Sequence, residues 1–327
     1  MSSEFSLNII KLALAGSLSF LAAFLVTPLL THILYTRKMW RKTVRTKALG
    51  GGHLPIFQKF HSEGEVKTPR FGGVLIWLVP PAVVFALYGL SFLDVWFLKE
   101  LNFLTRSQTW LPLATLIAAS AVGFLDDIVQ VVSPPSGKIL GFLWEKLGKH
   151  IAGGLSLKFR FSLVALIGLV GAWWFFAKLG WTTLHVPGIG DFDIGMWYIP
   201  VFIIVMLATY SGGVIDGLDG LSGGIFASIF TAFAVIAFSR EQFDLATLCI
   251  AIVGSLLAFL WFNIPPARFY MGETGMMGLT ATLTVVAFLT DSVLVLPIIG
   301  FLLVLESGSV IAQLLSKKFL KKKLLLA

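Results

Sequence analysis

Nine apolar stretches of the chain are each about long enough to cross a membrane, and they constrain its fold more than any other feature. A transmembrane helix needs roughly 20 apolar residues to cross about 30 Å of hydrocarbon. Only 13% of the residues are charged and 57% are hydrophobic, whereas about a quarter of a soluble domain is charged. The sequence therefore predicts an all-α polytopic membrane protein that forms a single domain, residues 1–327. The predicted spans lie near 8–35, 72–90, 110–130, 161–180, 197–215, 221–239, 244–262, 276–290 and 292–315.

The basic residues predict which ends of the spans face the cytoplasm. Nine Lys and Arg residues lie in the loop 36–71, so the positive-inside rule places that loop inside. Counting spans onward also places 131–160, 263–275 and the lysine-rich tail inside. The segment 182–195, TTLHVPGIGDFDIG, alternates apolar and polar residues around a Pro-Gly turn and predicts a small external β-hairpin. We expect Lys11, in the first span, to extend its amine outward to water.

Several functional classes have no support in the sequence. The single cysteine, Cys249, excludes a disulfide framework and a Cys-based metal site. The five histidines show none of the short spacings that zinc sites use, and we find neither a P-loop nor a dinucleotide-binding glycine motif. The net charge of +8 comes largely from loops beside apolar spans, which favours lipid or phosphate partners over nucleic acid.

Five carboxylates fall on the predicted cytoplasmic side in apolar or glycine-rich surroundings. They lie in the segments AVGFLDDIV, GVIDGLDGLSGG and FYMGETGMMG. Acids avoid the bilayer centre, so some clustering at one face is expected without function, but acids without obvious basic neighbours favour a bound cation. Oxygen ligands alone indicate Mg²⁺ or Mn²⁺. The five are Asp126, Asp127, Asp216, Asp219 and Glu273.

Spacing suggests how these acids divide their roles. Asp216 and Asp219 are three residues apart and would share one face of a helix. Asp126 and Asp127 are adjacent and would point about 100° apart, so one could hold metal while the other handles a proton or a phosphate. Glu273, between two glycines before a span, suits a helix N-terminus that contacts an anion.

Basic residues at the same face would complete a phosphate pocket. Lys67 lies in VKTPRFGG, and Lys158 and Arg160 lie in GGLSLKFR. Positive-inside topology explains any one of them alone. As a set beside a metal site, they fit a pyrophosphate or a lipid phosphate.

The motifs FLDDIV, VIDGLDGLSGG, NIPPARFYMGETG, KTPRFGG and LESGSVIAQLLSKK occur together and in order. In this the chain resembles the polyprenyl-phosphate N-acetylhexosamine-1-phosphate transferases, most closely those that transfer phospho-MurNAc-pentapeptide, over nearly its whole length. The resemblance implies a Mg²⁺-dependent enzyme of the bacterial inner membrane, with its active site facing the cytoplasm. The reaction would join UDP-MurNAc-pentapeptide to undecaprenyl phosphate and yield lipid I and UMP for peptidoglycan. A homodimer is the implied assembly.

The resemblance also implies roles for individual residues. Its catalytic acids fall on Asp126, Asp127 and Asp219, and Asp126 would contact the lipid phosphate. Its metal-side acids fall on Glu273, Asp127 and Asp216, and whether Asp127 or Asp216 assists Glu273 stays open, as does a one-step or two-step route. Substrate contacts fall on residues of both the basic and the polar motifs: Lys67, Thr68, Lys158, Arg160, Asp216 and Asn263.

Some positions depart from the family pattern. Glu273 stands where the family usually has aspartate, Gln130 where it has lysine, and Gly213 where it has asparagine. The family continues into a loop with three histidines and a tenth span, whereas this chain ends at Ala327, so we expect a shortened member. Two alternatives remain open: a sibling enzyme that transfers GlcNAc-1-phosphate to the same lipid, and a cation-coupled transporter.

Overall fold

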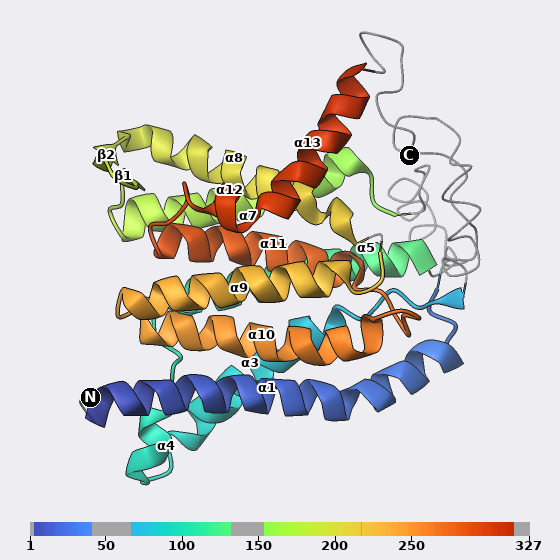
Figure 1. Ribbon diagram of the computed structural model, residues 1–327, viewed down its shortest axis with the longest axis horizontal. Coiled ribbons are helices and arrows are strands. Elements are labelled where there is room, and N and C mark those ends of the chain that lie inside the picture. Colours follow the sequence, from blue (N-terminus) through green and yellow to red (C-terminus); the bar gives the residue numbers. More distant parts are fainter. Residues whose placement is uncertain (1–2, 41–66, 132–153, 217, 317–327) are drawn as a thin grey trace, which may run out of the picture.

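The computed structural model describes residues 3–40, 67–131, 154–216 and 218–316. These residues form a bundle of long helices that run side by side (Figure 1). The longer helices are α1 (Ser3–Thr36), α3 (Val74–Leu90), α5 (Trp110–Val131), α7 (Leu157–Trp173), α8 (Tyr198–Ser211), α9 (Leu221–Ser239), α10 (Phe243–Asn263), α11 (Gly272–Leu289) and α13 (Phe301–Leu315). The short elements are α4 (Trp96–Glu100), the π-helical turn Trp174–Lys178, the 3-10 turns Gly195–Trp197 and Gly212–Ile215, α12 (Leu296–Ile299), β1 (Thr183–Val186) and β2 (Gly190–Asp193).

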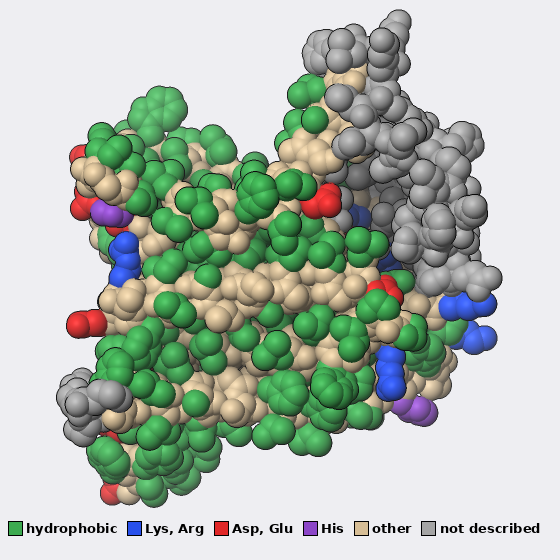
Figure 2. Space-filling view, in the orientation of Figure 1, with side chains coloured by type: hydrophobic (Ala, Val, Ile, Leu, Met, Phe, Trp, Pro, Cys, Tyr) green, Lys and Arg blue, Asp and Glu red, His purple; other side chains and the backbone are tan. Residues whose placement is uncertain are grey.

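The helices confirm an all-α, multi-pass membrane protein. Six of them are long and apolar enough to cross a membrane, and three shorter apolar helices, 74–90, 195–211 and 301–313, lie where the sequence predicts further spans. Figure 2 shows hydrophobic side chains spread along the sides of the bundle, while charged side chains lie mostly toward its two ends. That distribution suits a lipid environment around the sides.

Helix α11 lies at the centre of the bundle. Almost all of its residues are buried, and it packs against α5 and α8, while α10 packs against α1 and α9. Close packing depends on small residues, as in other membrane bundles. A Cβ on Gly123 of α5 would lie 2.1 Å from the carbonyl oxygen of Glu273, so glycine at this position lets α5 reach the start of α11.

The predicted hairpin is present as the antiparallel pair β1–β2, with Thr183 opposite Asp193 and Val186 opposite Gly190. It lies at the same end of the bundle as the N-terminus (Figure 1), and we call this the hairpin end. At this end Lys11 does not extend to water, contrary to the sequence prediction. Its side chain is buried, and Nζ lies 2.8 Å from Oδ1 of Asp244 at the start of α10.

The last predicted span, 292–315, is not one continuous helix. Helix α12 ends at Ile299, and α13 begins at Phe301 after Gly300. Glycine lowers the cost of a break in a helix, and α13 then leans away from the bundle (Figure 1). The stretch is mostly apolar, which predicted one span, and apolar content does not reveal a change of helix direction.

Candidate active site

Arg160, in the first turn of α7, joins two of the predicted acids. Its guanidinium contacts Asp126 Oδ2 at 2.9 Å and Glu273 Oε1 at 2.5 Å. Asp126 is fully buried near the end of α5, while the Glu273 side chain is 22% exposed. A single arginine therefore connects α5, α7 and α11 at the end of the bundle opposite the hairpin, which we call the acid end.

Asp126 has further hydrogen-bond donors. Gln130, one turn later, donates Nε2 to Oδ2 at 2.6 Å, and the Leu155 backbone N–H donates to Oδ1 at 2.6 Å. A buried carboxylate is costly unless paired and hydrogen-bonded. These donors hold Asp126 in one orientation, and Gln130 fills this role at a position where the family has lysine.

Asp127 caps the N-terminus of α11. Its Oδ1 accepts from the Glu273 backbone N–H at 3.0 Å, and its Oδ2 accepts from the Thr274 N–H at 2.8 Å and from the Thr274 hydroxyl at 2.7 Å. A helix N-terminus favours a negative charge. The anion that the sequence predicted at the MGETG motif is thus, in this structure, a side chain of the protein itself.

Asp216 and Asp219 do not share a helix face, contrary to the spacing argument. Asp216 ends the 3-10 turn 212–215, and Asp219 lies in the turn that precedes α9. Asp216 Oδ2 accepts from Gly272 N–H at 3.0 Å, whereas Asp219 Oδ2 accepts from Ala267 N–H at 3.0 Å. The glycines around them favour a turn over a helix, and the two carboxylates hold different segments.

Burial raises the pKa of Asp216 to about 6, and the positive charge of Arg70 and the Gly272 hydrogen bond oppose that rise. Negative charge from Glu273 adds to it. Burial therefore makes ionisation of Asp216 less favourable than in water. An additional cation nearby would favour the ionised form.

Arg70 is the site residue that sequence reasoning missed. Its charge acts on both Asp127 and Asp216, and its Nε is buried without a hydrogen-bond partner. The sequence counted Arg70 only among the bases that set topology. Its position directly after the Thr-Pro motif was the available signal.

Backbone pairing brings Arg70 to the acids. Tyr270 N–H donates to the Pro69 carbonyl at 2.8 Å, and the Gly72 and Gly73 N–H groups donate to the Tyr270 and Met271 carbonyls at 2.8 Å each. Gly272 has φ +72°, and a Cβ there would lie 2.1 Å from the Arg70 carbonyl oxygen. Only glycine adopts this positive φ readily and, because it has no Cβ, allows the Arg70 carbonyl to come this close.

The remaining predicted residues divide into buried and exposed ones. Asn263 accepts from Gly220 N–H at 3.0 Å and donates to the Phe269 carbonyl at 2.8 Å, so both ends of its amide connect neighbouring segments. Thr68 is buried beside Tyr270, with which it shares a hydrogen bond. Lys67 and Lys158 are exposed at the same end.

The donor set at the acid end fits Mg²⁺ only if a substrate completes the site. Among the described residues, no three of these acids bring ligand atoms within 4.8 Å of one another. Mg²⁺ is usually held by one or two carboxylates together with substrate phosphates. Glu273 fits this role best because it is partly exposed and its charge acts on three other carboxylates, those of Asp126, Asp127 and Asp216.

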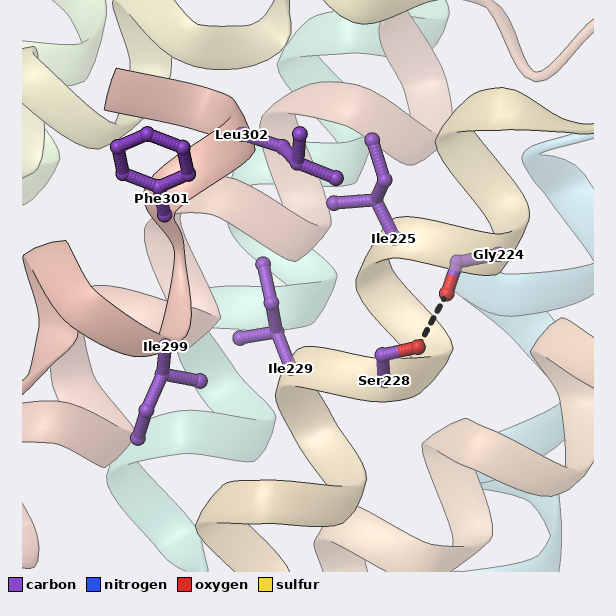
Figure 3. A pocket seen from close by; sticks show the side chains of 7 residues that line it. All are labelled: Gly224, Ile225, Ser228, Ile229, Ile299, Phe301 and Leu302. Carbon is purple, nitrogen blue, oxygen red and sulfur yellow. Dashed lines mark hydrogen bonds between the residues drawn. The ribbon is translucent and has the colours of Figure 1, made fainter. Parts of the chain in front are cut away.

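A separate pocket lies between α9 and the break in the last helix (Figure 3). Its cavity measures about 180 Å³ and is lined by Gly224, Ile225, Ser228, Ile229, Ile299, Phe301 and Leu302. The only side-chain hydroxyl, that of Ser228, donates to the Gly224 carbonyl of its own helix at 3.0 Å. The pocket therefore offers apolar contacts and no groups for chemistry.

Comparison with known proteins identifies the family to which the chain belongs. Residues 109–291, more than half of the chain, match Glycosyl transferase family 4. A phospho-N-acetylmuramoyl-pentapeptide-transferase of Levilactobacillus brevis is 33% identical over 261 residues, which cover 79% of this chain and 73% of that protein. Proteins of the same description from Geobacillus thermodenitrificans and Geobacillus sp. are 31% and 32% identical over 316 and 318 residues, each covering 95% of this chain and 85% of the relative. The chain is therefore an enzyme of Glycosyl transferase family 4 and belongs to its phospho-N-acetylmuramoyl-pentapeptide-transferases.

Proposed function

We propose that this enzyme transfers phospho-MurNAc-pentapeptide from UDP-MurNAc-pentapeptide to undecaprenyl phosphate, which yields lipid I and UMP. Its relatives in Levilactobacillus brevis and Geobacillus thermodenitrificans are named phospho-N-acetylmuramoyl-pentapeptide-transferases, which supports this transfer. The reaction would take place at the cytoplasmic face of the bacterial inner membrane, because the described bases Lys67, Arg70, Lys158 and Arg160 lie at the acid end and positive residues favour the cytoplasmic side. A homodimer remains part of the proposal.

The observation that carries the proposal is the convergence of four carboxylates around two arginines. Arg160 contacts Asp126 and Glu273, and Arg70 acts on Asp127 and Asp216. Joining two phosphorylated substrates requires that their mutual repulsion be offset, and catalysis of phosphoryl transfer consists mainly of positioning and charge neutralisation. Bound Mg²⁺ would neutralise charge on the pyrophosphate of the nucleotide substrate.

The residues then take distinct roles in the proposed reaction. Asp126, held rigidly by Gln130 and Leu155, would orient or deprotonate the lipid phosphate for in-line attack. Glu273 would supply the metal-facing carboxylate, with Asp216 as its neighbour. Arg160 and Arg70 would offer their guanidinium groups to phosphate oxygens. Asp127, whose oxygens already accept hydrogen bonds from the first turn of α11, would position Glu273 rather than bind the metal by itself.

The proposal is tested by giving purified enzyme radiolabelled UDP-MurNAc-pentapeptide or UDP-GlcNAc together with undecaprenyl phosphate and MgCl2. We expect lipid-linked product and UMP from the first donor only. Product from UDP-GlcNAc alone would favour the sibling reaction. The transporter alternative predicts acids at mid-membrane on broken helices, whereas these acids gather at one end, and UMP release that requires the lipid phosphate would exclude transport as the main activity.

A further inference from the structure

Three metal-ligating side chains meet at the hairpin end, away from the proposed active site. His185 on β1 lies directly opposite Asp191 on β2, and residues that are directly opposite on antiparallel strands project to the same face. His185 Nδ1 lies 2.6 Å from Asp191 Oδ1. Asp291, from the turn after α11, accepts a hydrogen bond from the His185 backbone N–H to Oδ1 at 3.2 Å.

We propose that His185, Asp191 and Asp291 form a binding site for a divalent transition-metal ion of the Zn²⁺ class. Each offers one ligand atom, and these atoms all lie within 4.8 Å of one another. One imidazole nitrogen and two carboxylates suit Zn²⁺, which often takes three protein ligands and a water. Mg²⁺ and Ca²⁺ prefer oxygen ligands alone.

Binding requires only small side-chain movements. Bonds of about 2.0–2.2 Å to a tetrahedral ion place ligand atoms roughly 3.4 Å apart. The close His185–Asp191 contact would open slightly, and the wider separations, which are at most 4.8 Å, would shorten by up to about 1.4 Å, within the reach of side-chain rotation. The side chains of His185 and Asp191 are 36% and 64% exposed, so an ion can reach them from solvent.

Charge at the site favours a cation. Two carboxylates face one imidazole, and among the described residues Arg240 is the cation that contacts this group, with Nη1 4.0 Å from Asp291 Oδ2. At that distance the arginine offsets the charge of Asp291 only in part and leaves its oxygens available. Arg240 is therefore a competitor of the ion, and neutralising Arg240 should tighten metal binding.

The ion would connect two segments that are distant in sequence. His185 and Asp191 belong to the hairpin that joins α7 to α8, and Asp291 follows α11. The spacings between the three ligands are 6 and 100 residues, so the short spacings sought in the sequence could not reveal the site. An ion that binds only the folded protein stabilises it in proportion to the logarithm of its concentration over Kd.

The test uses the full chain purified without a histidine tag, stripped with EDTA and returned to buffer with excess MgCl2. ZnCl2 is then titrated while bound zinc is measured by elemental analysis and stability by thermal unfolding. We expect zinc to raise the Tm of the wild type. In the Asp291→Asn and His185→Asn variants the affinity of this site for zinc should fall about tenfold or more, whereas in Arg240→Gln it should rise.

Asp94→Asn is the matched control, because Asp94 is a solvent-exposed carboxylate that pairs with Lys99. This variant should bind zinc as the wild type does. Asparagine at position 291 keeps an oxygen acceptor for the His185 N–H, so loss of zinc binding in that variant would not arise from a lost hydrogen bond. A wild type without a zinc-dependent rise in Tm, or site variants with unchanged zinc stoichiometry and affinity, would overturn the proposal.

Discussion

The two ends of the bundle differ in how their acidic side chains are paired with basic ones. At the hairpin end two lysine pairs, which lie outside the proposed zinc site, are one-to-one: Lys11 with Asp244 and Lys99 with Asp94. Among the described residues at the acid end, Arg70 and Arg160 act on four carboxylates, and backbone N–H groups donate further hydrogen bonds to them.

The difference indicates what each end can do. One-to-one pairs satisfy their charges within the protein and mainly fix loops to helices. Carboxylates that share a cation retain negative charge, and a divalent ion or a substrate-bound cation can neutralise it. We therefore expect the two lysine pairs at the hairpin end to be structural and the carboxylates that share cations at the acid end to be functional, and each substitution below tests that expectation.

Replacement of Asp126 by Asn should have the largest effect. We expect the transfer rate to fall about 10³-fold or more, because the variant loses the charge and the base that face the lipid phosphate. The amide oxygen can still accept from Leu155, so the fold should persist. The measurement is UMP release at saturating substrates, with Asp94→Asn as a hairpin-end control. Activity within tenfold of wild type would remove Asp126 from the reaction.

Replacement of Glu273 by Gln should lower the rate by about 10²-fold and raise the MgCl2 concentration for half-maximal rate about tenfold. Glutamine keeps the length of the side chain but offers a weaker ligand. A magnesium titration of the rate measures both effects, and Glu273→Asp, which keeps the charge, should retain more affinity for the metal. An unchanged magnesium titration would place the metal elsewhere.

Replacement of Lys11 by Met tests the hairpin end. It leaves Asp244, whose side chain is 18% exposed, without its cation. We expect a loss of about 2 kcal/mol in the free energy of unfolding and an unchanged transfer rate per folded molecule. Lys99→Met is the matched control: its pair with Asp94 is exposed, so its loss should cost under about 1 kcal/mol. A changed catalytic rate in Lys11→Met would show that the two ends are coupled.

Replacement of Arg70 by Gln should raise KM for the UDP-sugar about tenfold with a smaller change in kcat, because a hydrogen-bonded charge to phosphate would be lost. Steady-state kinetics with the donor varied measure the effect. Arg268→Gln is the control, since Arg268 lies in a nearby loop but stacks on the Phe262 ring at 5.5 Å. Equal KM values for both variants would assign Arg70 a structural role only.

The sequence was sufficient to predict the helical membrane fold, because apolar stretches of about 20 residues are typical of transmembrane helices. It also predicted the external hairpin and placed Asp126 and Glu273 at one end. The change of helix direction after Gly300 was missed, since the residues on both sides are mostly apolar and together predict one span. The partner of Lys11 was missed because Asp244 lies far away in sequence.

Within the candidate site, sequence motifs gave the residue types but not their contacts. The spacing of Asp216 and Asp219 suggested a shared helix face, whereas Asp216 ends a 3-10 turn and Asp219 lies in the turn before α9, where Gly220 has φ +78°. Asp127 looked like a free ligand until both its oxygens proved to cap α11. Such contacts depend on how α5 and α11 pack, and local sequence carries little information on that.

The smallest expected effect is a change in stability with pH that comes from Asp216. Its pKa in the folded protein is about 6, above the value near 3.9 expected in an unfolded chain. The folded protein therefore binds more protons between these values, so the stabilisation from a protonated Asp216 is fully present below about pH 4 and is lost as the pH rises through 6. Without metal, the wild type should lose about 1 kcal/mol relative to Asp216→Asn between pH 5 and 7.5, because Asp216 is only partly buried. Thermal unfolding of both proteins in EDTA measures the difference. MgCl2 at pH 7.5 should reduce that loss if Asp216 faces the metal, and an unchanged difference would leave Glu273 as the metal ligand without help from Asp216.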